Sequence, residues 1–562
     1  MKNPITNYLR CFLLILIALI AHPAFAQQEQ HHFTKADTLR GTITPQRAWW
    51  KVKFYDLHVT VQPGDSAVNG YNHITYQVTQ KPKQMQIDLQ HPLQIDQIKQ
   101  DGKALSFHRV ENTNAYFVDM PADLKKGSLH KISVYYHGRP KVAKNAPWDG
   151  GFIWTQDSLG NRWVATAVQG LGASAWWPNK DHQSAEPDSM SIHITVPDPM
   201  VDISNGRLRG ITHHDNDMTT YSWFVSNPIN NYDVAVNAGN YVNFSDTLHG
   251  KKGVLDLSYW VLKQHLDLAK KQFQQVKPML RCFEKWFGPY PFYKDSYKLV
   301  EAPHLGMEHQ SAVAYGNGFQ NGYHGSDLSG TGWGMKWDFI IVHESAHEWW
   351  GNNITTKDIA DMWVHEGFAS YAESIYTECR FGKKAGEEYT IGLRDRIQNK
   401  HPVIGPHGVN SEGFSGTDMY YKGNNMLNTI RHIIHNDEVW KSILQGLQKH
   451  FYHQTVTSKQ IESYINSKTN YDLSPVFDQY LRHADLPVLQ YKIENGTFHY
   501  RWKADVSGFD MPVEVTLKDG AYSFIHPTEK WQTTEISLSN PDDFKVNTNF
   551  YVATESVKSV NQ

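Results

Sequence analysis

The stretch from Trp337 to Glu373 constrains the fold of this chain more than any other. It opens with an apolar run that contains no glycine or proline, and such a run predicts a buried helix. The run leads directly into the motif His343-Glu344-x-x-His347. Residues four apart share one face of a helix, so both imidazoles can reach one metal ion while Glu344 lies beside it.

A third candidate ligand, Glu366, follows nineteen residues after His347. Two histidines and a carboxylate leave the fourth position of a tetrahedral zinc site open to water. The alternative is two ordinary histidines on a helix, because in a chain with 30 histidines among 562 residues the bare motif arises by chance about one time in ten. The helical context and the spaced carboxylate favour one zinc ion per chain, held by His343, His347 and Glu366.

This spacing and its flanks resemble the gluzincin aminopeptidases of peptidase family M1, the family of aminopeptidase N and leukotriene hydrolase. Segment 347–352 (His-Glu-Trp-Trp-Gly-Asn) is similar to the family's His-Gln-Trp-Phe-Gly-Asn. Segment 363–373 is similar to its Trp-Leu-Asn-Glu-Gly-Phe-Ala segment. Thermolysin-type endopeptidases place the third ligand one residue further on, and they are the alternative zinc peptidase.

The resemblance implies an anchor for the amino terminus of a peptide. Gly306, Met307 and Glu308 lie where the family has Gly-Ala-Met-Glu-Asn, with direct matches at Met307 and Glu308. Glu308 would pair with the free ammonium group of the substrate. Gln169 falls where the family has Thr-Gln-x-Gln or Thr-Gln-x-Glu, and it is a second candidate for this contact. The alternative for Gln169 is an ordinary loop amide.

The resemblance also implies a catalytic tyrosine. Segment 420–423 (Tyr-Tyr-Lys-Gly) is similar to the family's Tyr-Glu-Lys-Gly, which places the catalytic residue at Tyr420 and puts Tyr421 in the glutamate position. The alternative is two aromatic core residues at the start of a helix. Glu373 lies two helical turns beyond Glu366. It either orients a zinc-binding histidine or is a plain surface carboxylate.

The amino terminus predicts export from the cytoplasm. Lys2 and Arg10 precede a short apolar run, and Ala24-Phe25-Ala26 is a small-residue cleavage pattern. We therefore expect a signal peptide cleaved after Ala26 and a secreted or periplasmic protein. An uncleaved membrane anchor is the alternative, although the run is short for crossing a bilayer. No later segment is long and apolar enough to span a membrane.

Charge and cysteine content narrow the class further. Cleavage would change the formal net charge from −3 to −5, and no basic stripe is present, which argues against nucleic acid as a partner. Cys282 and Cys379 would remain in the mature chain, and the sequence leaves open whether they pair. It carries no signal for an oligomeric state.

Periodicity along the chain predicts a multidomain α+β protein. From about residue 48 to 245, apolar and polar residues alternate as in antiparallel strands. The pattern changes near Gly253, with helical periodicity from Leu266 to Trp286 and a mostly helical stretch from Gly330 to about Arg482, and strands return after about Asp485. We predict a signal peptide (1–26), an N-terminal β saddle or sandwich (27–250), a thermolysin-like and mainly helical catalytic domain (251–484) and a small C-terminal β-sandwich (485–562). The resemblance implies a short form without the long helical C-terminal domain of larger relatives.

These observations predict a zinc-dependent aminopeptidase that removes N-terminal residues from peptides. Glu344 would activate the zinc-bound water, and Tyr420 would stabilise the oxyanion. Two alternatives remain, namely a zinc endopeptidase and a non-catalytic peptide-binding protein on the same fold. The endopeptidase has no use for an ammonium anchor at Glu308. A non-catalytic protein has no reason to keep both Glu344 and Tyr420.

Overall fold

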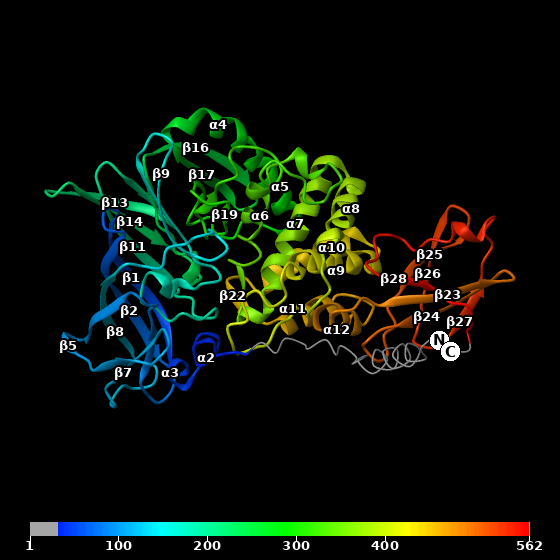
Figure 1. The fold of residues 1–562 in the computed structure, drawn as a ribbon, viewed down its shortest axis with the longest axis horizontal. Coiled ribbons are helices and arrows are strands. Elements are labelled where there is room, and N and C mark those ends of the chain that lie inside the picture. The colour runs from blue at the N-terminus through cyan, green and yellow to red at the C-terminus, as the bar shows by residue number, and fades with distance from the viewer. Residues whose placement is uncertain (1–31, 561–562) are drawn as a thin grey trace, which may run out of the picture.

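The computed structural model describes residues 32–560, and the predicted signal peptide lies outside them. Three units follow one another along the longest axis of the molecule (Figure 1). A β unit coloured blue to cyan occupies one end, a mainly helical unit in green and yellow the middle, and an orange-to-red β unit the other end. This arrangement confirms the predicted multidomain α+β class. Within residues 32–560, no helix has both the length and the apolar character to cross a membrane.

An eight-stranded sheet is the frame of the first unit, with the strand order β13-β14-β11-β1-β2-β8-β4-β5. The bounds are β1 Trp50–Gln62, β2 Ala67–Val78, β4 Gln94–Gln100, β5 Lys103–Ala104, β8 Leu129–Gly138, β11 Ser189–Pro197, β13 Arg207–His214 and β14 Met218–Val225. Buried and half-exposed residues alternate along β1 and β11, as the sequence predicts. The β1–β11 pair is parallel and the other pairs of this sheet are antiparallel. Alternation predicts which face of a strand is buried, but it does not predict the partner strand.

Two smaller sheets and two short helices complete the first unit. They are α2 Lys35–Gly41, α3 Pro45–Ala48, a sheet of β3 Met85–Asp88, β7 Ala115–Val118 and β6 Phe107–Arg109, and a sheet of β12 Val201–Ile203, β15 Asn237–Gly239, β10 Arg162–Ala167 and β9 Gly151–Gln156. Large apolar side chains such as Trp50, Trp176 and Trp177 fill one core shared by these sheets. Strand β10 ends just before Gln169 and thereby holds this residue next to the middle unit.

A five-stranded sheet with the order β16-β17-β18-β20-β19 begins the middle unit. The bounds are β16 Tyr241–Gly250, β17 Gly253–Leu262, β18 Tyr297–Glu301, β19 Gly306–Met307 and β20 Val313–Tyr315. The boundary predicted between residues 250 and 251 falls in the turn of the β16–β17 hairpin, and both strands of that hairpin belong to this sheet. We therefore propose a boundary near residue 240. Strand β19 forms an edge of the sheet and consists of Gly306 and Met307.

Helices make up most of the remainder of the middle unit. The bounds are α4 Leu266–Gln272, α5 Val276–Phe287, α6 Phe339–Ala346, α7 Trp363–Phe381, α8 Lys383–Gly392, α9 Asp418–Ile434, α10 Asp437–His450, α11 Ser458–Asn466 and α12 Ser474–Arg482, with a short parallel pair of β21 Ile354–Thr356 and β22 Gln454–Val456. Helix α7 is buried over most of its length and packs against α6, α8 and α9. Cys282 of α5 and Cys379 of α7 form a disulfide, which is the pairing that the sequence left open.

The third unit is a small β structure that packs on the helices of the middle unit. Its bounds are β23 Val488–Glu494, β24 Thr497–Lys503, β25 Val513–Lys518, β26 Ala521–Ile525, β27 Gln532–Glu535 and β28 Ala553–Ser556. The amide of Tyr551 donates to Thr429 Oγ1 of α9 at 3.0 Å, and the Tyr480 hydroxyl of α12 donates to the Tyr551 carbonyl. One hydrophobic core is continuous across the middle and third units. The third unit therefore supports α9 from the outside.

Candidate active site

Helix α6 carries the His-Glu-x-x-His motif and is buried on all sides. Its N-cap residue Asp338 accepts hydrogen bonds from the amides of Ile340 and Ile341, which satisfies two donors at the start of the helix. Asp338 also accepts a hydrogen bond from the Tyr315 hydroxyl of β20 at 2.8 Å. The cap therefore ties the start of α6 to the five-stranded sheet, and His343 and His347 follow one turn apart.

His343, His347 and Glu366 form a compact triangle of ligand atoms. The two Nε2 atoms lie 3.3 Å apart, and Glu366 Oε2 lies 3.5 Å from that of His343 and 3.4 Å from that of His347. A tetrahedral zinc ion with bonds of about 2.0–2.2 Å requires ligand atoms separated by roughly 3.3–3.5 Å. Glu366 Oε2 is buried and has no hydrogen-bond donor, as expected for an atom that binds a metal ion. The predicted zinc site fits this geometry.

The outer ring nitrogens of both histidines are held by hydrogen-bond partners. His343 Nδ1 lies 2.7 Å from Glu373 Oε1, and the Tyr389 hydroxyl donates to Glu373 Oε2 at 2.7 Å. His347 Nδ1 lies 2.9 Å from the Trp350 carbonyl. These contacts turn each Nε2 toward the shared ion position. Glu373 is fully buried, so the alternative of a surface carboxylate is wrong.

Glu344 lines the same cavity as the zinc ligands. Burial raises the pKa of its carboxyl to about 7, against the lowering influence of the adjacent His343. The neighbouring Gly306 gives this carboxylate room, because a Cβ there would lie 2.9 Å from Glu344 Oε1 and 2.8 Å from Ile340 Cγ2. Gly306 therefore has a steric role in addition to its place in the sequence motif.

Glu308, the predicted ammonium anchor, is buried and lines the same cavity as the zinc ligands. Gln169 Nε2 donates to Glu308 Oε1 and, at 3.1 Å, to Glu366 Oε1. The Tyr232 hydroxyl donates to Glu308 Oε1 at 3.0 Å. Burial raises the pKa of the Glu308 carboxyl, and the Glu366 carboxylate nearby adds to this effect. Met307 is buried beneath the anchor. This group of carboxylates favours a bound cation, whether a metal ion or an ammonium group.

Tyr420 enters the site from the first turn of α9. Its ring stacks on that of His343, with 6.1 Å between ring centroids and 26° between planes. Burial raises the pKa of the Tyr420 hydroxyl well above its usual value, so the phenol keeps its proton and can donate a hydrogen bond. Tyr421 also lines the cavity.

A contact between two glycines sets the distance between α7 and α9. A Cβ added at Gly423 would lie 2.9 Å from the Gly367 Cα, and one added at Gly367 would lie 3.1 Å from the Met419 carbonyl oxygen. Only residues without side chains permit this close approach. It brings Tyr420 of α9 next to Glu366 of α7.

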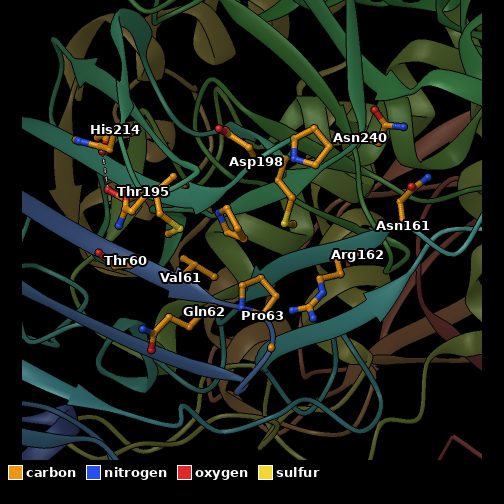
Figure 2. A pocket seen from close by; sticks show the side chains of 17 residues that line it. Thr60, Val61, Gln62, Pro63, Asn161, Arg162, Thr195, Asp198, His214 and Asn240 are labelled. Atoms are coloured by element: carbon orange, nitrogen blue, oxygen red, sulfur yellow. Dashed lines mark hydrogen bonds between the residues drawn. The ribbon is translucent and has the colours of Figure 1, made fainter.

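These residues surround a cavity of about 350 Å³ between the first and middle units. Pro147, Trp148, Gln169 and Gly170 line it from the first unit, and the other lining residues come from the middle unit. A larger open groove of about 880 Å³ lies elsewhere, at the ends of β1 and β11 (Figure 2). Its lining is mainly threonine, asparagine and proline, and it contains none of the predicted site residues.

Sequence reasoning missed three residues of the site. Tyr232 and Tyr389 hold Glu308 and Glu373, respectively, and neither tyrosine lies in a motif. Glu412 adds another carboxylate to the lining of the cavity, and partial desolvation there raises its pKa. Only the spatial contacts identify these residues. Asn352 differs from these three residues, because it lies in the motif segment 347–352. Its side chain donates to the Glu308 carbonyl at 2.9 Å.

Comparison with known families agrees with this geometry. The model of the peptidase family M1 domain matches residues 272–480, and the model of the peptidase M1 N-terminal domain matches residues 51–232. A buried His-Glu-x-x-His helix with a distant glutamate ligand defines a zinc metallopeptidase of the gluzincin class. The chain belongs to peptidase family M1.

Individual relatives are distant. Aminopeptidase N of Lactobacillus helveticus is 23% identical over 470 residues, which cover 77% of this chain and 51% of that protein. Aminopeptidase N of Canis lupus familiaris is 24% identical over 415 residues, covering 69% of this chain and 42% of that protein. The chain thus spans about half the length, or less, of these relatives.

A solved structure of similar size shares the fold. The M1 zinc metallopeptidase from Deinococcus radiodurans superimposes with a TM-score of 0.65 at 20% identity, covering 79% of this chain and 95% of that one. A mutant of that metallopeptidase bound to the substrate Tyr-Ser-Ala gives a TM-score of 0.66 at 19% identity, covering 80% of this chain and 98% of that one.

Proposed function

We propose that this protein is a zinc-dependent aminopeptidase that hydrolyses the first peptide bond of peptides with a free amino terminus. The observation that carries the proposal is the position of Glu308, a buried carboxylate in the same cavity as the zinc ligands and Glu344. A cavity of about 350 Å³ can hold a few residues of a peptide. Membership of family M1 and the similarity to proteins named aminopeptidase N support the same activity.

The mechanism follows from the placement of the side chains. His343, His347 and Glu366 would hold the zinc ion, which when bound polarises a carbonyl group and lowers the pKa of water toward about 7. The Glu344 carboxylate accepts a proton from the attacking water and transfers it to the leaving amine as the carbon–nitrogen bond breaks. The Tyr420 hydroxyl donates a hydrogen bond to the oxyanion that develops on the carbonyl oxygen.

Glu308 and Gln169 would select the end of the peptide. The ammonium group of the substrate would take its place beside Glu308, where the cluster of buried carboxylates compensates for its lost hydration. Because Glu308 and Glu366 share the Gln169 amide, the ammonium site lies directly beside the zinc ligands. This short distance leaves room for one residue before the scissile bond and disfavours an endopeptidase.

Both side chains to which we assign a catalytic role line the cavity, Glu344 buried and Tyr420 half-buried, which disfavours a non-catalytic peptide-binding protein. Glu344 and Tyr420 line the cavity from different helices, α6 and α9. We further propose that the protein is secreted or periplasmic after cleavage behind Ala26. The Cys282–Cys379 disulfide supports an oxidising compartment.

The proposed chemistry is tested with Glu344→Gln. The amide has almost the same size as the carboxylate but cannot accept the proton, so kcat on peptides with a free amino terminus should fall by about 10²–10⁴-fold. The zinc content, measured by elemental analysis, should match that of the unaltered protein. A Glu344→Gln variant with near-normal turnover would show that another group is the base, and the proposed mechanism would be wrong.

A further inference from the structure

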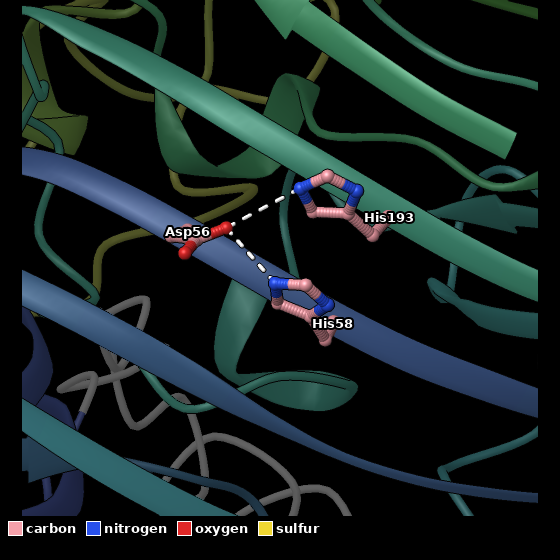
Figure 3. A group of neighbouring side chains, drawn as sticks. All are labelled: Asp56, His58 and His193. Carbon is pink, nitrogen blue, oxygen red and sulfur yellow. Dashed lines mark hydrogen bonds and ion pairs between the residues drawn. The ribbon is translucent and has the colours of Figure 1, made fainter. Parts of the chain in front are cut away.

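The exposed face of the eight-stranded sheet carries a second group of metal-binding side chains, Asp56, His58 and His193 (Figure 3). Asp56 and His58 are two residues apart on β1 and therefore point to the same face. The parallel pairing of β1 with β11 places His193 directly beside His58. Strand register thus brings together two segments that are far apart in the sequence.

The ligand atoms of this group converge on one point. His58 Nε2 lies 3.0 Å from Asp56 Oδ1, and His193 Nε2 lies 3.4 Å from the same oxygen. The corresponding separations between the predicted zinc ligands of the active site are 3.3–3.5 Å. All ligand atoms of each group lie within 4.8 Å of one another. The imidazoles of His58 and His193 stack at 4.1 Å between centroids, so both rings approach Asp56 from the same side.

Neighbouring side chains fix the orientation of this group. His193 Nδ1 lies 2.8 Å from the Ser222 hydroxyl of β14, which holds the ring with Nε2 directed at Asp56. The ring of Tyr71 stacks on the other face of His58 at 4.5 Å. His73 of β2 lies opposite Asp56 in the β1–β2 register, and its buried Nδ1 has no hydrogen-bond partner. The side chains of Asp56, His58 and His193 are 25–32% exposed, so an ion can reach them from solvent.

We propose that Asp56, His58 and His193 form a second binding site for a divalent transition-metal ion, separate from the predicted catalytic zinc. Two imidazoles and one carboxylate form a donor set that suits zinc and its neighbours in the transition series. An ion there would crosslink β1 to β11 at the centre of the sheet and would stabilise the folded state by binding it selectively. It would not contribute to peptide hydrolysis, because the group lies on β1 and β11 of the first unit and none of its residues lines the active-site cavity.

The test measures zinc bound to the full chain in which both histidine ligands of the active site are replaced by alanine. His343→Ala/His347→Ala protein is dialysed to equilibrium against micromolar free zinc, and bound zinc is determined by elemental analysis. We expect one zinc ion per chain. Adding His193→Ala or His58→Ala should remove it without changing the circular dichroism spectrum, because both side chains lie on the exposed face of the sheet.

His137→Ala is the matched control, because His137 is also paired with a single aspartate on this sheet, with its Nδ1 2.7 Å from Asp96 Oδ1. Added to the His343→Ala/His347→Ala protein, this substitution should leave the one bound zinc ion in place. A second arm uses the chain with an intact active site, which should bind two zinc ions, and one after His193→Ala. The proposal is wrong if the His343→Ala/His347→Ala protein binds no zinc at this concentration. It is equally wrong if zinc binding survives the loss of both His58 and His193, since the three side chains would then be only a hydrogen-bonded group.

Discussion

Adjacent tyrosines at the start of α9 show how the chemistry depends on single positions. Tyr420 stacks on His343, whereas Tyr421 occupies the place where the family has a glutamate. We predict that Tyr420→Phe lowers kcat about 10²–10³-fold, roughly 2.7–4 kcal/mol, because one donor to the oxyanion is lost. KM should change little, because the hydrogen bond strengthens only as charge develops in the transition state. Steady-state kinetics on a short peptide measures both constants.

Tyr421→Phe is the control for this prediction, and it should retain most of the activity. In both variants the aromatic ring remains, so zinc content and melting temperature should stay near those of the unaltered protein. The reverse result, with Tyr421→Phe inactive and Tyr420→Phe active, would mean that the motif is aligned one residue out of place. Full activity in both variants would show that neither hydroxyl stabilises the oxyanion.

Glu373 acts through His343, and its loss should affect metal binding before chemistry. We predict that Glu373→Gln weakens zinc affinity about 10–100-fold, because the carboxylate no longer orients and polarises the imidazole. Competition with a chelator of known affinity measures the change. Tyr389→Phe removes only the hydroxyl that donates to Glu373 and should have a smaller effect in the same direction. Unchanged affinity in Glu373→Gln would show that Glu373 does not support zinc binding through His343.

At the level of elements, the close crossing of α7 and α9 determines whether Tyr420 reaches the zinc ligands. We predict that Gly423→Ala lowers kcat, because its methyl group would meet the Gly367 backbone at 2.9 Å and push the helices apart. Overpacking of this kind costs about 1–3 kcal/mol of folding stability. Activity assays together with thermal unfolding separate the two effects.

Gly446→Ala in α10 is the matched control for the crossing. Its added methyl would meet the hydroxyl end of Tyr464, a half-buried side chain that can move, and α10 contributes no residue to the cavity. This variant should keep its kcat. If Gly423→Ala is as active as Gly446→Ala, the glycine contact does not position Tyr420.

In the whole molecule, the candidate site depends on the position of the first unit relative to the middle unit. Gln169 follows β10 of the first unit, but its amide donates to Glu308 and Glu366 of the middle unit. Asn205 of the first unit likewise donates to the Gln310 carbonyl, two residues after Glu308, at 2.8 Å. A change in the relative position of the units would therefore alter the ammonium anchor as well as the shape of the cavity.

The metal site could be predicted from the sequence because its ligands lie in short motifs at fixed spacing. Helical spacing alone brings His343 and His347 together, and a motif at a fixed distance adds Glu366. The antiparallel strands and the helices were likewise visible in periodicity. The placements of Tyr232 and Tyr389 were not visible, because they depend on packing between segments far apart in the chain. The parallel β1–β11 pairing was missed for the same reason, and with it the group of Asp56, His58 and His193.

Glu308, a buried carboxylate in the same cavity as the zinc ligands, is proposed to select peptides with a free amino terminus. The most direct test incubates the zinc-loaded protein with one peptide in two forms, free and N-acetylated, and follows the products by mass spectrometry. Acetylation removes the charge that Glu308 would bind and adds bulk at the same position. We predict stepwise loss of N-terminal residues from the free peptide and no cleavage of the acetylated one. Equal rates on the two forms, or cleavage at internal bonds, would show that Glu308 does not select the free amino terminus.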